Sequence, residues 1–261
     1  MGTKRENILI YRGSNAVVKE PEIRKARFNK DFYWGFYCTV LQKQAEKWAD
    51  KNRKSKIVNI YRLSNLEGIR YKKFDEMNIV NCRNGKSHDY EVVKGPMADD
   101  TIYNYISDYI DGYITKAAFW ELAKFRYPDL FYLCSLIEFI GRETKNKGSD
   151  IVNILGYDNL LHIFNHAEVY HCERIESVAD EYINDFKIKK GNYDQVSKTK
   201  DNYPTYWDLG KIYMRLIRDT VKDGDLINKL IEIYNSWIVD SIENYNSSFY
   251  YMSPEYIKAC Y

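Results

Sequence analysis

The chain has 261 residues, enough for two domains of ordinary size, and 45% of them are hydrophobic, so a substantial core can form. Its 39 basic and 37 acidic side chains leave a formal net charge of +2, which does not indicate a nucleic-acid partner. The 25 tyrosines, beside only 13 glycines and 5 prolines, argue against a disordered chain. No apolar run approaches the roughly 18 residues of a membrane-spanning helix, so no membrane partner is expected.

The cysteine pattern and the first residues predict a protein of the reducing cytoplasm. The 5 cysteines are odd in number and no two form a Cys-x-x-Cys pair, so we expect no disulfide framework. The start of the chain lacks the apolar segment of a signal peptide. Met1 and Gly2 superficially match a myristoylation signal, but Glu6 stands where that signal needs Ser or Thr.

The first half of the chain is predicted to be rich in strands, with inserted helices. Short apolar, aromatic or β-branched runs predict strands at residues 7–11, 32–40, 56–62 and 90–93. Gly35 interrupts the second run, which indicates a bend or the close approach of a ligand. Residues 42–52 predict an amphipathic helix with Ala45, Trp48 and Ala49 on one stripe.

Helical spacing takes over after residue 100. It predicts helices at residues 102–110, 117–125, 129–142, 151–154, 159–166, 175–186, 206–221 and 226–244. The polar residues 187–203 predict an exposed linker. Ser253 is a predicted N-cap with Pro254 at the first position of a last short helix. The sequence therefore predicts an α+β chain with domains at 1–127, 128–190 and 191–261, the last a linker followed by a C-terminal helical module.

Two segments of the first half carry the residue types that a dinucleotide needs. The first is residues 11–14, Tyr-Arg-Gly-Ser, and the second is residues 35–39, Gly-Phe-Tyr-Cys-Thr. An arginine offers a fork of donors for phosphate or ribose oxygens. A glycine admits a ligand close to the backbone, an aromatic ring gives a stacking face, and hydroxyls bind sugar oxygens.

These segments resemble the ADP-ribosyltransferase superfamily and, more narrowly, a family of uncharacterised bacterial domains that open with Tyr-His-Gly-Ser. That family continues with Asp-Phe-x-x-Gly-Phe-Tyr-x-Thr, Gln-Ala-x-x-Trp-Ala and Gly-Pro-x-Ala-Asp-Asp. The three motifs stand here in the same order, at residues 31–39, 44–49 and 95–100. The resemblance covers roughly residues 7–127.

The resemblance implies a split β-sheet domain of the ADP-ribosyltransferase type that takes NAD as its substrate and needs no metal. It implies that Arg12 holds the ribose or diphosphate, that Gly13 and Ser14 line the cleft, that Tyr37 stacks on nicotinamide and that Thr39 supports this wall. The NAD-contacting residues implied in this way are Tyr11, Arg12, Gly13, Ser14, Phe36, Tyr37 and Thr39, with Arg12 and Tyr37 as the catalytic pair. Transfer would break the glycosidic bond to nicotinamide through an oxocarbenium-like state, as in glycoside hydrolysis.

Two features depart from the family pattern. Arg12 replaces the usual His, although Tyr-Arg-Gly resembles the opening of the arginine-type transferases. The family continues from a segment like residues 119–124 into a strand that carries the third catalytic Glu or Gln. Here residues 126–128 run directly into residues 129–134, which predict a helix, so the third position is unassigned, and Asp129 is the nearest carboxylate in sequence.

The helical half of the chain also resembles a family of bacterial domains. Residues 129–187 are similar to a small helical domain of unknown function that is often encoded with, or fused to, the first family in bacteria. This context implies a toxin–antitoxin or phage-defence system. The leading hypothesis is therefore an NAD-binding, ADP-ribosyltransferase-like effector. The alternative is a catalytically degenerate fold whose helical half binds a protein partner, as an antitoxin does.

Several of these residues also have plain structural interpretations. Arg12 could be a solvated turn residue, and Tyr37 could belong to the core instead of a cleft. Helix capping accounts for at least one carboxylate of residues 99–100. His162 and His166 are spaced as metal ligands on one helix face, but no His-Glu-x-x-His pattern surrounds them, and core packing is the favoured interpretation. The basic residues 142–147 predict a solvated helix end.

Overall fold

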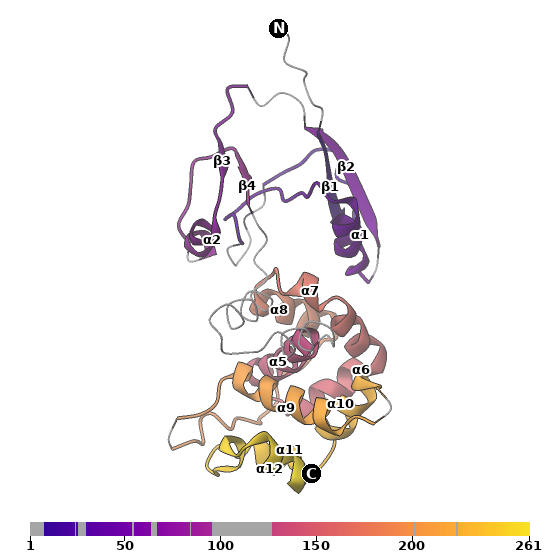
Figure 1. Ribbon diagram of the computed structural model, residues 1–261, viewed down its shortest axis with the longest axis vertical. Coiled ribbons are helices and arrows are strands. Elements are labelled where there is room, and N and C mark those ends of the chain that lie inside the picture. The colour runs from indigo at the N-terminus through magenta and orange to yellow at the C-terminus, as the bar shows by residue number, and fades with distance from the viewer. Residues whose placement is uncertain are drawn as a thin grey trace. The chain divides into compact units, whose positions relative to one another are not determined.

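The structure is a computed structural model that describes residues 8–23, 25, 30–53, 55–63, 67–83, 85–95, 127–200, 202–222 and 224–261. The chain divides into two compact units (Figure 1). The first is Met1–Asp99 with Cys172–Arg174, and the second is Asp100–His171 with Ile175–Tyr261. The predicted helices at 102–110 and 117–125, the segment 119–124 and residues 96–100 of the Gly-Pro motif lie outside the described residues.

The N-terminal unit contains an antiparallel pair of strands. Strand β1 (Ile8–Ser14) pairs with β2 (Ile57–Leu63) in a register that places Ile8 opposite Leu63 and Ser14 opposite Ile57. The predictions at 7–11 and 56–62 are confirmed as strands. However, β1 continues through Gly13 and Ser14, because the partner strand is long enough to pair with both residues.

Helix α1 (Gln42–Asp50) packs against this strand pair, which Figure 1 shows as the helix beside β1 and β2. A Cβ atom at Gly13 would lie 2.1 Å from the carbonyl oxygen of Ala45 and 2.4 Å from the amide nitrogen of Ala49. Both alanines are buried. The glycine and the two alanines, one helical turn apart, therefore let the strand and the helix approach at backbone distance.

The predicted strand at 32–40 is wrong. Only Thr39 pairs with β1, through backbone hydrogen bonds of 2.7 and 2.9 Å with Tyr11. The preceding residues form a turn in which Tyr33 takes a positive φ of 64°. The Tyr37 hydroxyl accepts a 2.8 Å bond from Phe32 N and donates one of 2.8 Å to Tyr33 O. The aromatic residues that predicted a strand instead hold a tight turn together.

A second, parallel pair of strands follows. Strand β3 (Tyr71–Lys73) pairs with β4 (Val92–Lys94), and helix α2 (Glu76–Arg83) lies between them in sequence. The strand predicted at 90–93 is displaced toward the C-terminus by about two residues. Neither β3 nor α2 was predicted, because the exposed Tyr-Lys-Lys of β3 shows no alternation and α2 buries only a few side chains.

The second unit is helical throughout its described residues. Its helices are α5 (Tyr127–Thr144), α6 (Gly148–Asn165), α7 (Ala167–Tyr170), α8 (Ile175–Asp185), α9 (Tyr206–Thr220), α10 (Leu226–Tyr234), α11 (Ile238–Ile242) and α12 (Pro254–Cys260), with a 3-10 turn η1 (Phe249–Tyr251). Together with the first unit, these elements confirm a mixed α+β chain.

The helix predictions in this unit are broadly confirmed, with two differences. The helices predicted at 151–154 and 159–166 form α6, which is interrupted at Gly156, where φ is 68°. The helix predicted at 226–244 is divided into α10 and α11. The predicted cap of α12 is confirmed, because the Ser253 hydroxyl accepts a hydrogen bond from Tyr256 N.

A hydrophobic cluster unites the helical modules expected at 128–190 and 191–261. Buried residues of α5 and α9, including Leu133, Leu136, Leu209 and Tyr213, belong to this cluster. No helix within the described ranges is long and apolar enough to cross a membrane.

The polar segment 187–203 is not simply an exposed linker. Gly191 N and Tyr193 N donate hydrogen bonds of 2.8 Å each to the carbonyl oxygens of Thr144 and Lys145. Ile188 is buried. The segment thus packs on the C-terminal end of α5, where the last carbonyl groups of the helix need donors.

Candidate functional site

The N-terminal unit brings Arg12, Phe36 and Tyr37 together. The Nη1 atom of Arg12 donates a 2.9 Å hydrogen bond to the carbonyl oxygen of Tyr37. The guanidinium carbon lies 4.6 Å from the centroid of the Phe36 ring. Phe36 in turn packs edge-to-face on Tyr61, with 5.3 Å between the centroids. Arg12 is therefore a half-buried cation held on an aromatic wall.

Arg12 keeps donors that no described residue uses. Its Nε atom is buried without an acceptor among the described residues. Its Nη2 atom also makes no hydrogen bond to them, but this atom is not enclosed by the protein. A guanidinium with an accessible outer nitrogen can bind a phosphate or ribose oxygen.

The Tyr37 side chain is already engaged within its own turn. Its ring stacks on Phe32 at 5.7 Å between centroids and 14° between planes, and its hydroxyl forms hydrogen bonds with the backbone atoms Phe32 N and Tyr33 O. The Lys30 ammonium lies 5.7 Å from the Tyr37 ring centroid. Tyr37 thus fixes the carbonyl group that receives Arg12, and its proposed stacking on nicotinamide stays a prediction.

The hydroxyl groups expected in the cleft bind protein atoms in this structure. The Ser14 hydroxyl donates a 2.6 Å hydrogen bond to Ala16 O and accepts a 3.0 Å bond from Asn59 Nδ2. The Thr39 hydroxyl donates to Gln44 Oε1 and accepts from Leu41 N at 3.1 Å. These contacts fasten the loop after β1 and the start of α1.

Asn59 is a residue that the sequence interpretation missed. It is buried in β2, and besides Ser14 it contacts Ala16 O at 3.1 Å and accepts from Val18 N at 2.8 Å. An asparagine between the apolar residues Val58 and Ile60 of this strand was the available signal, because a buried amide needs several partners.

Two titratable groups, the exposed Cys38 thiol and the Tyr61 hydroxyl, feel the positive charge of Arg12. Desolvation raises the pKa of Cys38 to about 11, and the positive charge of Arg12 opposes this shift only in part. Desolvation likewise raises the pKa of Tyr61, with the Cys38 charge adding to the effect. Both groups therefore stay protonated beside Arg12.

The third catalytic position stays unassigned. Helix α5 begins at Tyr127, as the sequence predicts for this region, and Asp129 lies in its first turn. From residue 127 onward the described residues contain no strand. The described part of the chain therefore offers no strand after that point to carry a third catalytic side chain.

The two histidines with metal-ligand spacing lie close together on α6 and just after it. The ring centroids of His162 and His166 are 4.2 Å apart, and Nδ1 of His166 lies 2.8 Å from the carbonyl oxygen of His162. Within the ranges that the structure describes, no group of three His, Cys, Asp or Glu side chains is placed to hold a metal ion.

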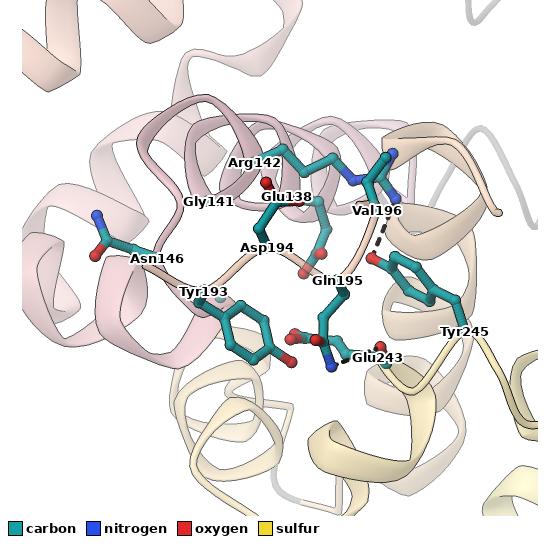
Figure 2. A pocket seen from close by; sticks show the side chains of 11 residues that line it. Glu138, Gly141, Arg142, Asn146, Tyr193, Asp194, Gln195, Val196, Glu243 and Tyr245 are labelled. Carbon is teal, nitrogen blue, oxygen red and sulfur yellow. Dashed lines mark hydrogen bonds between the residues drawn. The ribbon is translucent and has the colours of Figure 1, made fainter. Parts of the chain in front are cut away.

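A second candidate site, which the sequence interpretation missed, lies inside the helical unit (Figure 2). A cavity of about 260 Å³ is lined by Glu138, Gly141, Arg142, Asn146, Gly148, Tyr193, Asp194, Gln195, Val196, Glu243 and Tyr245. Figure 2 shows the carboxylates of Glu138 and Glu243 and the hydroxyl of Tyr193 directed toward its interior. The predicted solvated helix end at 142–147 is wrong in part, since Arg142, Asn146 and buried Thr144 belong to this packed region.

The two glutamates of the cavity are buried, with exposed fractions of 4% for Glu138 and 2% for Glu243. Tyr234 donates a 2.9 Å hydrogen bond to Glu138 Oε1, and Tyr213 donates one of 3.3 Å to Glu243 Oε1. Burial raises the pKa of Glu138 to about 8, and repulsion from Glu243 adds to it. Burial also raises the pKa of Glu243, against hydrogen bonds from Tyr193 and Tyr213. A glutamate within the apolar run of α5 was the signal for this site.

A comparison of the chain with protein-family models finds a match to one family. Residues 8–135 match the family model described as "Protein of unknown function (DUF3990)". No curated protein and no solved structure matches the chain. The matched range spans the strands of the N-terminal unit and ends within α5. The first half of the chain is thus similar to a domain of unknown function.

Proposed function

We propose that the N-terminal unit binds NAD at Arg12 and acts as an ADP-ribosyltransferase-like effector in the cytoplasm of a bacterium, within a toxin–antitoxin or phage-defence system. The observation that carries this proposal is the guanidinium of Arg12, which lies on the Phe36 ring with an accessible Nη2 atom. The sequence motifs around it resemble those of the superfamily, and the two small sheets of this unit agree with a split β-sheet fold.

The arrangement suits an anionic ligand with sugar groups. The hydrogen bond to Tyr37 O and the contact with Phe36 fix the plane of the Arg12 guanidinium. A fixed fork loses less conformational freedom on binding a diphosphate than a mobile side chain would. The Lys30 ammonium beside Tyr37 adds positive charge to the same turn.

A second candidate function is NAD binding without transfer, in a catalytically degenerate domain that acts through a protein partner. The observation in its favour is the helix α5, which begins at Tyr127 where the family pattern continues into a strand. Loss of the third catalytic side chain removes stabilisation of the transition state and leaves the binding of the substrate in place.

Nicotinamide release distinguishes the two candidates. Incubation of NAD with the chain, in the presence of a bacterial lysate as a source of acceptors, releases nicotinamide if the domain transfers or hydrolyses. We expect Arg12→Ala to abolish that release and Arg62→Ala to leave it unchanged, because Arg62 is an exposed arginine of β2. Binding of NAD without any release would support the second candidate, and the absence of both binding and release would reject both.

A further inference from the structure

We propose that the cavity of the helical unit binds a small organic cation with a primary amino group. The cavity is bordered by the C-terminal half of α5, the segment 193–196 and the end of α11. Glu138 and Glu243 supply its two buried carboxylates, and Figure 2 shows both reaching toward the same interior space. The proposal concerns the second unit alone and does not depend on NAD binding by the first.

The bordering cations of this region are engaged with other partners. Lys147 Nζ pairs with Asp240 at 2.9 Å, and Lys145 Nζ pairs with Asp194 at 2.5 Å. Among the described residues, no Lys or Arg nitrogen lies within ion-pair distance of Glu138 or Glu243. Buried carboxylates normally have a paired cation or shed their charge by protonation, and neither glutamate has a cation paired with it among the described residues.

Arg142 does not fill that role. Its Nη2 donates hydrogen bonds of 2.6 Å to Pro204 O and 3.2 Å to the Tyr245 hydroxyl, the second of which is drawn in Figure 2. These bonds hold the guanidinium against the loop before α9 and the Tyr245 ring. Its positive charge lowers the pKa of Glu138, but by less than burial raises it.

Glu138 presents an oxygen atom to the cavity. Its Oε1 accepts from Tyr234, but no described residue donates to its Oε2, and this atom is not enclosed by protein atoms. The side chain itself is 4% exposed and lines the cavity, so a donor bound in the cavity can reach Oε2. An ammonium group has three donors, and this site offers carboxylate acceptors from Glu138 and Glu243.

The remaining walls leave room for such a ligand. The Tyr193 and Tyr245 rings line the cavity, and each already lies near a protein cation: Lys147 Nζ is 5.3 Å from the Tyr193 ring centroid and Arg142 Cζ is 5.6 Å from the Tyr245 ring centroid. A volume of about 260 Å³ exceeds the roughly 30 Å³ that one water molecule occupies in the liquid. The cavity therefore has room for an amino group with a short carbon chain.

Binding of a cation should release a proton. The charged or titratable groups around Glu138 include Tyr234 on α10, Glu243 at the end of α11, Tyr245 just after it, Cys134 and Arg142 on α5, and Tyr213 on α9. Since burial and Glu243 raise the pKa of Glu138 to about 8, the acid is mostly protonated at pH 7. An ammonium group at Oε2 favours the carboxylate form, so we expect about one proton to leave for each amine bound.

Calorimetry with 1,4-diaminobutane on the full chain tests the proposal, with 1,4-butanediol as the neutral probe of similar shape. We expect a Kd below about 1 mM for the diamine, no binding of the diol, and a binding heat that depends on the ionisation heat of the buffer. Glu138→Gln and Glu243→Gln should each weaken the binding of the diamine by about ten-fold or more. Glu143→Gln, on an exposed side chain of the same helix, should bind as the wild type does.

Three results would overturn the proposal. They are an absence of diamine binding at about 10 mM, equal binding of the diol, and full retention of affinity by both cavity variants. Circular dichroism and a cooperative thermal transition establish that each variant is folded before it is titrated. Since glutamine keeps the shape of glutamate and removes a buried group that can ionise, we expect both variants to fold.

Discussion

At the scale of single residues, two arginines of this chain are used in different ways. Arg12 and Arg142 each have a buried Nε without an acceptor among the described residues. Arg142 ties together the backbone of Pro204 and the ring of Tyr245. Arg12 makes one hydrogen bond, to Tyr37 O, and rests on an aromatic ring. Arg12 is therefore a side chain that is held in place from one side while its outer nitrogen stays accessible.

The pair of buried glutamates should make the stability of the chain depend on pH. The folded-state pKa of Glu138, about 8, lies above its ordinary value of 4.5. Between these two values the unfolded chain has lost a proton that the folded chain keeps, so stability falls as pH rises through this window. Below the window both states are protonated, and above it both are ionised.

We therefore expect Glu138→Gln to gain stability over the wild type as pH rises through this window, by up to about 1.4 kcal/mol for each pH unit. Urea unfolding at several pH values between about 5 and 8 measures this difference. Glu143→Gln is the control, since its side chain is exposed on the same helix. A constant difference between Glu138→Gln and wild type over the whole range would contradict the account.

At the scale of elements, the contact between β1 and α1 explains two of the sequence motifs together. Gly13 of the first motif faces Ala45 and Ala49 of the helix motif. Thr39 of the turn motif pairs with Tyr11 and contacts Gln44. The motifs therefore hold strand, turn and helix in a fixed relation, which keeps Arg12 and Phe36 in contact.

Substitution of Gly13 tests this packing. A Cβ atom at Gly13 meets backbone atoms of α1 at 2.1 and 2.4 Å, and backbone cannot move aside as a flexible side chain would. We expect Gly13→Ala to reduce the free energy of unfolding of the N-terminal unit by about 1–3 kcal/mol or more. At Gly35 a Cβ atom meets only the Tyr37 ring at 3.6 Å, so Gly35→Ala is the matched control.

Both variants would be measured by chemical denaturation followed by fluorescence, in a background in which Trp48 on α1 is the single tryptophan and the other four are replaced by phenylalanine. Equal stabilities for Gly13→Ala and Gly35→Ala would show that the helix does not approach the strand so closely.

Much of the element pattern was predictable from the sequence. Helices α1, α8 and α9 each have an apolar stripe, α9 and α12 also begin at a capping residue, and β2 is rich in apolar and β-branched residues. The turn at 31–37 was not predictable. It is held by hydrogen bonds of the Tyr37 hydroxyl to Phe32 N and Tyr33 O, and no spacing of residue types in the sequence indicates such bonds. The division between α10 and α11 likewise follows from packing.

The sites were predictable to different degrees. The meeting of Arg12 with residues 36–37 was indicated by the motifs, and the structure places these residues in contact. The motifs did not indicate that Ser14, Thr39 and Gly13 make contacts within the protein, because a sequence does not show which hydroxyl finds a protein partner. The Glu138 cavity joins residues about 100 positions apart, and spacing alone does not reveal such a pair.

At the scale of the whole molecule, burial is concentrated in the helical unit. The hydrophobic cluster of buried side chains runs from Leu130 to Ile257, and all its members come from α5 and the residues after it. In the described part of the N-terminal unit, the buried apolar side chains are Ala45, Ala49, Phe74, Ile79 and Cys82. Because stability grows with buried apolar area, the helical unit has the means to fold by itself.

We therefore expect residues 127–261, expressed alone, to fold into a helical protein with a cooperative thermal transition. Far-UV circular dichroism and calorimetry measure this, with the full chain as the reference. A gradual, non-cooperative loss of helical signal would show that the core of this unit needs the N-terminal half.

The central claim of this account is that Arg12 holds NAD, and calorimetric titration of NAD into the full chain tests it most directly. The account predicts binding that Arg12→Ala weakens by about ten-fold or more, a loss of at least about 1.4 kcal/mol, while Arg62→Ala binds as the wild type does. No heat of binding at millimolar NAD, or equal affinity in Arg12→Ala and wild type, would contradict it.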